Sequence, residues 1–223
     1  MDTRILMSIL VIGVVAMAAG AGTFAQFSDT ETSEGNTFTA GTIDLTVNDE
    51  NPLTNEVVKL SGIKPCEEHV VWKKVTASDN PYDLYLVIKG ITTGTGTMVE
   101  PECVAEGGTW SDGECSGNTA VDNIDAVTYY DLYLYSAGDD GECGTDDDEL
   151  IKTIEDGSRY FATVATGSQT TPLKLGSSLE PSKVYCVKQS FHLDGEAGNE
   201  YQGDTASFTE EFIATQVDVS PPS

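Results

Sequence analysis

Apolar residues that alternate with polar ones restrict the fold of this chain more than any other feature of its sequence. In the segment TIDLTV (42–47), Ile43, Leu45 and Val47 fall on one face of an extended backbone. A period of two is typical of a β-strand with one buried face. Strand patterns of this kind also occupy residues 57–60, 69–77, 83–91, 126–137, 159–165, 184–193 and 205–217. Clusters of Gly, Asp, Asn and Pro separate these segments, so the sequence predicts an all-β fold, an antiparallel β-sandwich.

Three further segments interrupt the strand pattern. Residues 92–123, rich in Gly and Thr, and residues 138–149, an acidic loop, are interpreted as insertions. Strand patterns that must pair lie on both sides of each insertion, so neither is expected to link two separate cores. Residues 147–157 (DDELIKTIEDG) predict one short helix. A length of 223 residues is compatible with one domain that carries such insertions.

The chain begins with the pattern of an export signal. Arg4 precedes an apolar run over residues 5–21, and the small-residue site Thr23-Phe24-Ala25 follows. We expect signal peptidase to cut between Ala25 and Gln26, so that residues 1–25 are a signal peptide. The alternative is an uncleaved membrane anchor, but the apolar run is shorter than the ~20 residues that a membrane span needs. The mature protein is therefore expected to be secreted, with no membrane contact after cleavage.

The charge of the chain restricts its partners. The formal net charge is −26 at pH 7. Cleavage after Ala25 leaves this value unchanged, because residues 1–25 contain one acid, Asp2, and one base, Arg4. Such a charge disfavours binding to nucleic acid and to anionic membrane surfaces, and it favours solubility and attraction of cations.

Residues with catalytic or metal-binding chemistry do not form a recognisable motif. The two histidines, His69 and His192, lie far apart in the sequence, which has no HExxH, CxxC or G-x-S-x-G motif. We therefore expect no enzyme activity, no cofactor and no metal centre. The acidic loop 138–149 lacks the spacing of an EF-hand, so a solvated charged loop is the preferred interpretation, with calcium binding as the alternative.

Strand aromatics offer two interpretations. They can stack on a carbohydrate, or they can fill the core and form cross-strand pairs, which is the more frequent arrangement in β-rich proteins. We prefer the second interpretation. The residues concerned are Trp72, Tyr129, Tyr130, Tyr133 and Tyr135.

Five cysteines in an exported chain indicate disulfides. Cys103 and Cys115 flank a turn-rich segment and are expected to bond to each other. Cys66 and Cys186 form the next pair that we favour, because both lie on or beside strands near the two ends of the domain pattern. Cys143 is then left over, either free or bonded to a neighbouring chain.

Several motifs resemble those of a known family. The stretch over residues 22–47 contains Phe24-Ala25 at the cut site, Phe27-Ser28-Asp29, and TFTAGTIDL. Residues 60–68 (LSGIKPCEE) and 200–216 (EYQGDTASFTEEFIATQ) are similar to later motifs of the same family. Together they resemble the TasA/camelysin family, exported filament subunits of bacterial biofilm matrices with archaeal bundling-pilus relatives. The insertions are unmatched, and Cys66 stands where the family often has glycine.

The resemblance implies a jelly-roll-like sandwich that is completed by a donor strand from a neighbouring subunit. Residues 26–36 would be the donor, residues 37–223 the sandwich domain, and the product an extracellular, cell-surface filament built as a homo-polymer. A polar ribbon suits this role because an added strand gains affinity from backbone hydrogen bonds, and burial of Phe27 would add about 2 kcal/mol. The expected donor residues are Gln26, Phe27, Ser28, Asp29, Thr30, Glu31, Thr32, Ser33 and Glu34.

Two other functions compete with this one. The first is a monomeric secreted module that binds glycans or cations through the insertions 92–123 and 138–149. The second is a protease, because some camelysin relatives carry a metalloprotease label, but the sequence supplies no evident zinc ligands.

Overall fold

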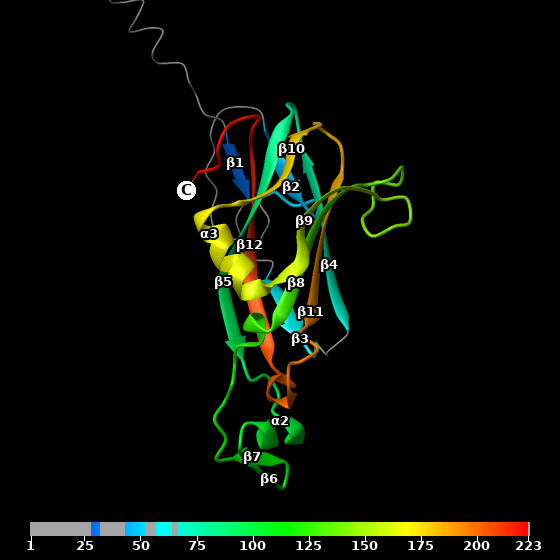
Figure 1. Ribbon diagram of the computed structural model, residues 1–223. Helices are drawn as coiled ribbons and strands as arrows, with labels where there is room; N and C mark the ends of the chain where they lie inside the picture. The colour runs from blue at the N-terminus through cyan, green and yellow to red at the C-terminus, as the bar shows by residue number, and fades with distance from the viewer. Residues whose placement is uncertain (1–27, 32–42, 52–56, 64–66, 223) are drawn as a thin grey trace, which may run out of the picture.

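The structure is a computed structural model that describes residues 28–31, 43–51, 57–63 and 67–222, of which 28–31 are described by their backbone only (Figure 1). The predicted signal peptide, Gln26, Phe27 and Cys66 lie outside these residues, as do residues 32–42 and 52–56. Within the described part, no helix is long and apolar enough to cross a membrane.

Two antiparallel sheets form a β-sandwich, which confirms the predicted fold class. The first sheet has the order β1-β12-β5-β10, with β3 also paired to β12, and the second has the order β2-β4-β11-β8-β9. The strands of the first sheet are β1 (Ser28–Glu31), β3 (Val57–Ser61), β5 (Tyr82–Gly94), β10 (Leu173–Leu179) and β12 (Thr205–Gln216). Those of the second are β2 (Leu45–Val47), β4 (Glu68–Ala77), β8 (Thr128–Ser136), β9 (Glu149–Tyr160) and β11 (Tyr185–Leu193).

An aromatic cluster occupies the centre of the core. Tyr130 and Phe191 come from the second sheet, Phe208 from the first, and Phe161 from helix α3 (Phe161–Thr170). The ring centroids of Phe161 and Phe208 are 4.7 Å apart, and those of Tyr130 and Phe191 are 5.1 Å apart. All four side chains are buried, so they join the two sheets and the helix into one core.

Helix α3 replaces the strand that the sequence predicts over residues 159–165. Phe161, Val164, Ala165 and Ser168 are its buried residues, a spacing of three and four that belongs to one helical face. The hydroxyl of Ser168 accepts a hydrogen bond of 2.9 Å from the backbone N–H of Ile88 and so fixes the helix to β5.

Strand β9 replaces the short helix that the sequence predicts over residues 147–157. Asp147 and Asp148 accept hydrogen bonds within the preceding loop, so they do not start a helix. Glu149–Tyr160 then pairs with β8 as an exposed edge strand. Strand β10 has no counterpart among the predicted strands. It is an edge strand of the first sheet, next to β5.

The segment 92–123 lies at one end of the sandwich, below the sheets in Figure 1. It contains helix α2 (Glu100–Ala105) and the hairpin of β6 (Thr109–Ser111) and β7 (Glu114–Ser116). Helix α2 packs against the short 3-10 helix η2 (Asn199–Tyr201), which precedes β12. A second 3-10 helix, η1 (Ile124–Ala126), leads into β8.

Two disulfides are present. Cys103 bonds to Cys115 and joins α2 to β7, in agreement with the sequence prediction. The expected pair of Cys66 and Cys186 is wrong, because Cys186 bonds to Cys143 instead. The acidic loop folds back over β11, which brings Cys143 next to Cys186 although they are 43 residues apart in sequence.

Candidate functional site

The outer edge of β12 is the first candidate site, because it receives part of the predicted donor segment. On one side, β12 pairs with β5 from Thr205 to Gln216. On the other side, β3 pairs with Thr205–Thr209, and β1 pairs with Phe212–Thr215. Two short strands therefore share this edge, one after the other.

Strand β1 pairs with β12 of its own chain. The register is antiparallel, with Ser28 opposite Thr215 and Glu31 opposite Phe212. Of the predicted donor residues only Ser28–Glu31 are described, and the others lie outside the described residues. A ladder of four residues forms about four hydrogen bonds at ~1 kcal/mol each. Ordering four residues costs ~1–2 kcal/mol per residue, so this pairing is close to balance.

A buried ion pair lies behind this edge. Lys73 on β4 and Glu210 on β12 face each other across the core, with Nζ and Oε2 3.5 Å apart and both side chains buried. Gln189 donates to Glu210 from Nε2, and the phenol of Tyr130 donates to Gln189 Oε1 at 2.7 Å. Burial, followed by the charge of Glu210, raises the pKa of Tyr130, so the phenol stays a donor. The sequence analysis missed this network, although Lys73 and Glu210 occupy inward positions of their strands.

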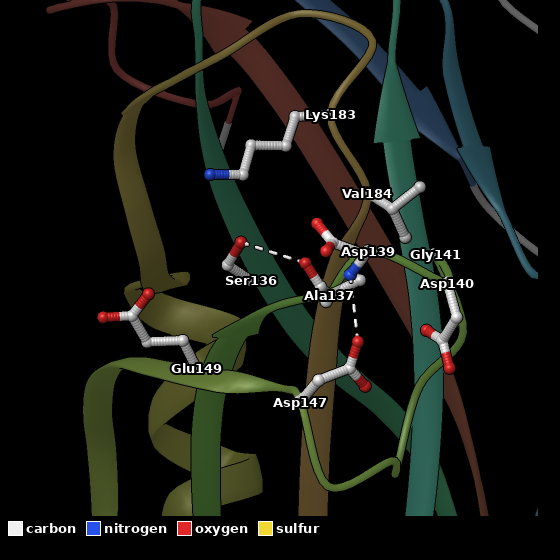
Figure 2. A pocket seen from close by; sticks show the side chains of 10 residues that line it. Ser136, Ala137, Asp139, Asp140, Gly141, Asp147, Glu149, Lys183 and Val184 are labelled. Carbon is white, nitrogen blue, oxygen red and sulfur yellow. Dashed lines mark hydrogen bonds between the residues drawn. The ribbon is translucent and has the colours of Figure 1, made fainter.

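The acidic loop borders a pocket, shown in Figure 2. Asp147 is turned toward the backbone N–H of Asp139, which donates to its Oδ2 at 2.9 Å, while Thr145 donates to its Oδ1 at 2.7 Å. The Thr145 hydrogen bond is the main cause of the lowered pKa of Asp147. The residues that line the pocket are Ser136, Ala137, Gly138, Asp139, Asp140, Gly141, Asp147, Glu149, Lys183 and Val184.

Hydrogen bonds within the loop also occupy two of its other carboxylates, those of Asp148 and Asp140. Gly144 and Thr145 donate from their backbone N–H groups to Asp148 Oδ2 at 2.7 and 3.1 Å. Glu142 donates from its N–H to Asp140 Oδ1 at 2.9 Å. The carboxylates therefore stabilise the turns of the loop, which supports the interpretation as a solvated charged loop.

An aromatic row lies on the outer face of the second sheet. The ring centroids of Trp72 and Tyr135 are 5.4 Å apart, and those of Tyr133 and Tyr135 are 6.4 Å apart. Further along the sheet, Tyr129 stacks on Tyr160 at 4.6 Å. These are cross-strand and same-face pairs, as predicted, and Tyr130 differs by lying in the core. The row is half-buried, and Gly144 of the acidic loop packs beside the indole of Trp72.

The two histidines lie on neighbouring strands of the second sheet, β4 and β11. His69 lies on β4 opposite Phe191, and His192 Nδ1 lies 3.3 Å from Asp131 Oδ2. Among the residues that the structure describes, no group of three or more His, Cys, Asp or Glu side chains is arranged to hold a metal ion. We identify no pair of nucleophile and base around the pocket of Figure 2.

Comparison with known proteins gives a match to one protein family. No curated protein gives a significant match to the chain. Residues 1–87 match the family model described as camelysin metallo-endopeptidase. That segment contains the export-signal pattern, the predicted donor residues and the strands from β1 into β5. The N-terminal 87 residues are thus similar to the camelysin family, and the remainder of the chain lies outside the match.

Proposed function

We propose that this protein is a secreted structural subunit that self-assembles by donor-strand exchange into extracellular filaments, as a pilus or a biofilm-matrix fibre. The segment 26–36 of one subunit would pair with the β12 edge of its neighbour. The pairing of Ser28–Glu31 with β12 is the observation that carries this proposal, because the same ladder can form between two chains. The family consists of exported proteins, and two disulfides fit an oxidising, extracellular location.

Exchange requires that β1 can leave its own chain at low cost. The four-residue ladder is close to energetic balance, as estimated above, and β12 keeps its partners β5 and β3 when β1 departs. An exchanged donor gains the same ladder on the neighbour, and contacts between the two globular bodies then favour the polymer. Ten extended residues reach ~33 Å, enough to cross a neighbouring sheet.

Electron microscopy of the purified mature chain tests the proposal most directly. We expect filaments from residues 26–223, and a folded monomer without filaments after deletion of residues 26–35. Phe27→Asp should slow assembly, because it removes the apolar anchor and places a charge at the contact between subunits. Normal filaments from the truncated chain would show that the N-terminal segment does not join the subunits.

A cross-linking experiment distinguishes exchange from stacking of closed subunits. Thr30 lies opposite Ile213 in the ladder, so Thr30→Cys with Ile213→Cys, in a Cys66→Ser background, places two thiols on facing positions. Filaments built by exchange should give a ladder of covalent oligomers on non-reducing gels. Cross-linked monomers from intact filaments would mean that β1 stays in its own chain. Each single cysteine variant is the control.

The aromatic row favours a second candidate function, a secreted module that binds glycans. Trp72, Tyr133 and Tyr135 lie side by side on the outer face of the second sheet, and Lys188 lies 5.8 Å from the ring of Tyr133. Sugar rings stack on such faces. A glycan-array screen of the mature chain tests this function independently of assembly. Trp72→Ala and Tyr135→Ala should each lose the glycan binding.

A further inference from the structure

Four carboxylates gather where the segment 92–123 meets the start of β12. Glu102 and Glu106 belong to α2 and its end, Asp122 lies near the end of the segment, and Asp204 directly precedes β12. Each of the other three acids acts electrostatically on Asp204. The cluster thus joins parts of the chain that lie about a hundred residues apart in sequence.

Two of these carboxylates are buried, and at least one oxygen of each lacks a hydrogen-bond donor. Glu102 is 0% exposed and Asp204 is 1% exposed. Both oxygens of Asp204, Glu102 Oε1 and Asp122 Oδ1 have no N–H or hydroxyl donor, and a hydrogen bond between Glu102 and Asp204 themselves requires a proton on one of the two carboxyls. Buried carboxylates are normally paired with a donor, a cation or a metal ion, so these oxygens point to a missing positive partner.

Glu106 differs from the other three acids. Asn118 donates to its Oε2 and the backbone N–H of Val121 donates to its Oε1, each at 2.6 Å. Its hydrogen bonds order the segment, and its charge adds to the negative potential around Glu102 and Asp204.

A close backbone contact adjoins the cluster. A Cβ atom added to Gly203 would lie 2.6 Å from the carbonyl oxygen of Thr97 and 3.1 Å from Glu102 Oε2. Gly203 has a φ of +102°, which favours glycine. The backbone that precedes Asp204 therefore packs closely against Thr97 and Glu102, and Glu102 Oε2 also accepts a hydrogen bond of 3.2 Å from the backbone N–H of Val99.

The segments that contain the four carboxylates have no basic residue of the lysine or arginine type. Residues 90–151 and 189–223, which build the cluster, contain no lysine and no arginine. Without a counter-charge, the folded chain must tolerate repulsion between two buried, adjacent carboxylates.

We propose that Glu102 and Asp204 bind a hard divalent cation, for which Ca²⁺ is the best match. Ca²⁺ accepts six to eight oxygen ligands in irregular geometry and takes carboxylates, carbonyls and water together. The site has two carboxylates, and the described residues contain no group of three or more His, Cys, Asp or Glu side chains that could hold a metal ion. Water completes the coordination, and the ion ties α2 to the start of β12.

Calorimetric titration of the mature chain, stripped of metal by a chelator, tests this site with CaCl₂ and MgCl₂ as probes. We expect one Ca²⁺ per chain with a dissociation constant in or below the ~0.1–1 mM range of extracellular modules, and weaker binding of Mg²⁺. Asp204→Asn and Glu102→Gln should each weaken Ca²⁺ binding by about tenfold or more. Asp112→Asn is the matched control, because it removes the same charge from an exposed turn of the same segment and should leave the affinity unchanged.

Thermal unfolding distinguishes loss of the proposed Ca²⁺ site from misfolding of the variant. It also distinguishes this site from Ca²⁺ binding at the acidic loop. Without Ca²⁺, Asp204→Asn should melt at the wild-type temperature or above it, because it relieves repulsion, and Ca²⁺ should no longer raise its melting temperature. Asp147→Asn in the acidic loop should retain the full Ca²⁺ response. The proposal is overturned if the wild-type chain shows no stoichiometric Ca²⁺ binding, if Asp204→Asn and Glu102→Gln bind as tightly as wild type, or if only Asp147→Asn abolishes the response. Should Asp204→Asn fail to fold, the wild-type titration and Glu102→Gln decide the question.

Discussion

The buried pair of Lys73 and Glu210 gives a prediction about the stability of the sandwich. The pair crosses the core from the second sheet to the first, and the exposure of the two side chains is 0% and 1%. Gln189 also donates to Glu210, so the carboxylate keeps one neutral donor if the lysine is removed. Removal of either charge leaves the other buried without its counter-ion.

The expected cost follows from that loss. Truncation of one partner of a buried ion pair destabilises a protein by about 3–5 kcal/mol. For a chain of this size, ~1 kcal/mol shifts the melting temperature by ~2–4 °C. Lys73→Met should therefore lower the melting temperature by roughly 6–20 °C. The double variant Lys73→Met with Glu210→Leu replaces both charges by apolar groups and should recover most of this loss.

Urea and thermal unfolding of the monomeric chain measure this effect, with a neighbouring ion pair as the control. Lys89 and Glu211 form a pair one position along β12, with exposures of 50% and 12%. Lys89→Met should cost less than ~1 kcal/mol, as for surface pairs. If Lys73→Met costs no more than Lys89→Met, or if the double variant is as unstable as the single one, the buried pair does not stabilise the core as argued.

Three further predictions concern pH, the second disulfide and ionic strength. Asp83 is buried and accepts hydrogen bonds from Lys174 Nζ at 2.7 Å and Ser178 N–H at 2.9 Å. Burial raises its pKa, but these partners more than offset that, and the pKa is lowered. The ionised Asp83 therefore stabilises the fold at pH values above its ordinary pKa of 3.8, and this contribution is lost as the pH falls below it. Asp83→Asn should reduce the urea midpoint at pH 7 and cause little change near pH 2. The double variant Cys143→Ser with Cys186→Ser should lower the free energy of unfolding by up to roughly 4 kcal/mol, since it opens a long loop. Equal urea midpoints for the variant and the wild-type protein would contradict this. Assembly followed by light scattering should be faster, and fibres harder to melt, at ~0.5 M salt than at ~0.01 M, because salt screens repulsion between chains of net charge −26. Assembly indifferent to ionic strength would rule out this electrostatic control.

Much of the sandwich follows from the period of two in the sequence. Where one face is buried and the other meets solvent, as in the inward residues Val75 and Ala77 of β4, alternation alone identifies the strand. The strands predicted at β2, β3, β5, β8, β11 and β12 are also confirmed, although β5 and the second half of β12 are buried on both faces. The disulfide of Cys103 and Cys115 was also predictable, because a local turn brings the two thiols together.

The remaining features depend on contacts that no local pattern contains. Phe161 and Val164 are as compatible with a strand as with a helix, and the choice comes from packing of Phe161 against Phe191 and Phe208. Cys143 meets Cys186 only because the acidic loop folds back over β11. Buried charges such as Glu102 contradict the usual rule that carboxylates face solvent, so burial could not be read from residue type.

The division of the β12 edge between β3 and β1 explains how a subunit could exchange a strand without losing its core. Release of β1 removes a four-residue ladder, whereas β12 stays hydrogen-bonded to β5 from Thr205 to Gln216 and to β3 over Thr205–Thr209. The ion pair of Glu210 with Lys73 and the packing of Phe208 against Phe161 hold the same strand from within. Opening of the edge is thus separated from unfolding of the sandwich. The balance between a closed subunit and the proposed filament then depends on contacts between globular bodies and on the repulsion between their charges, rather than on the stability of the fold itself.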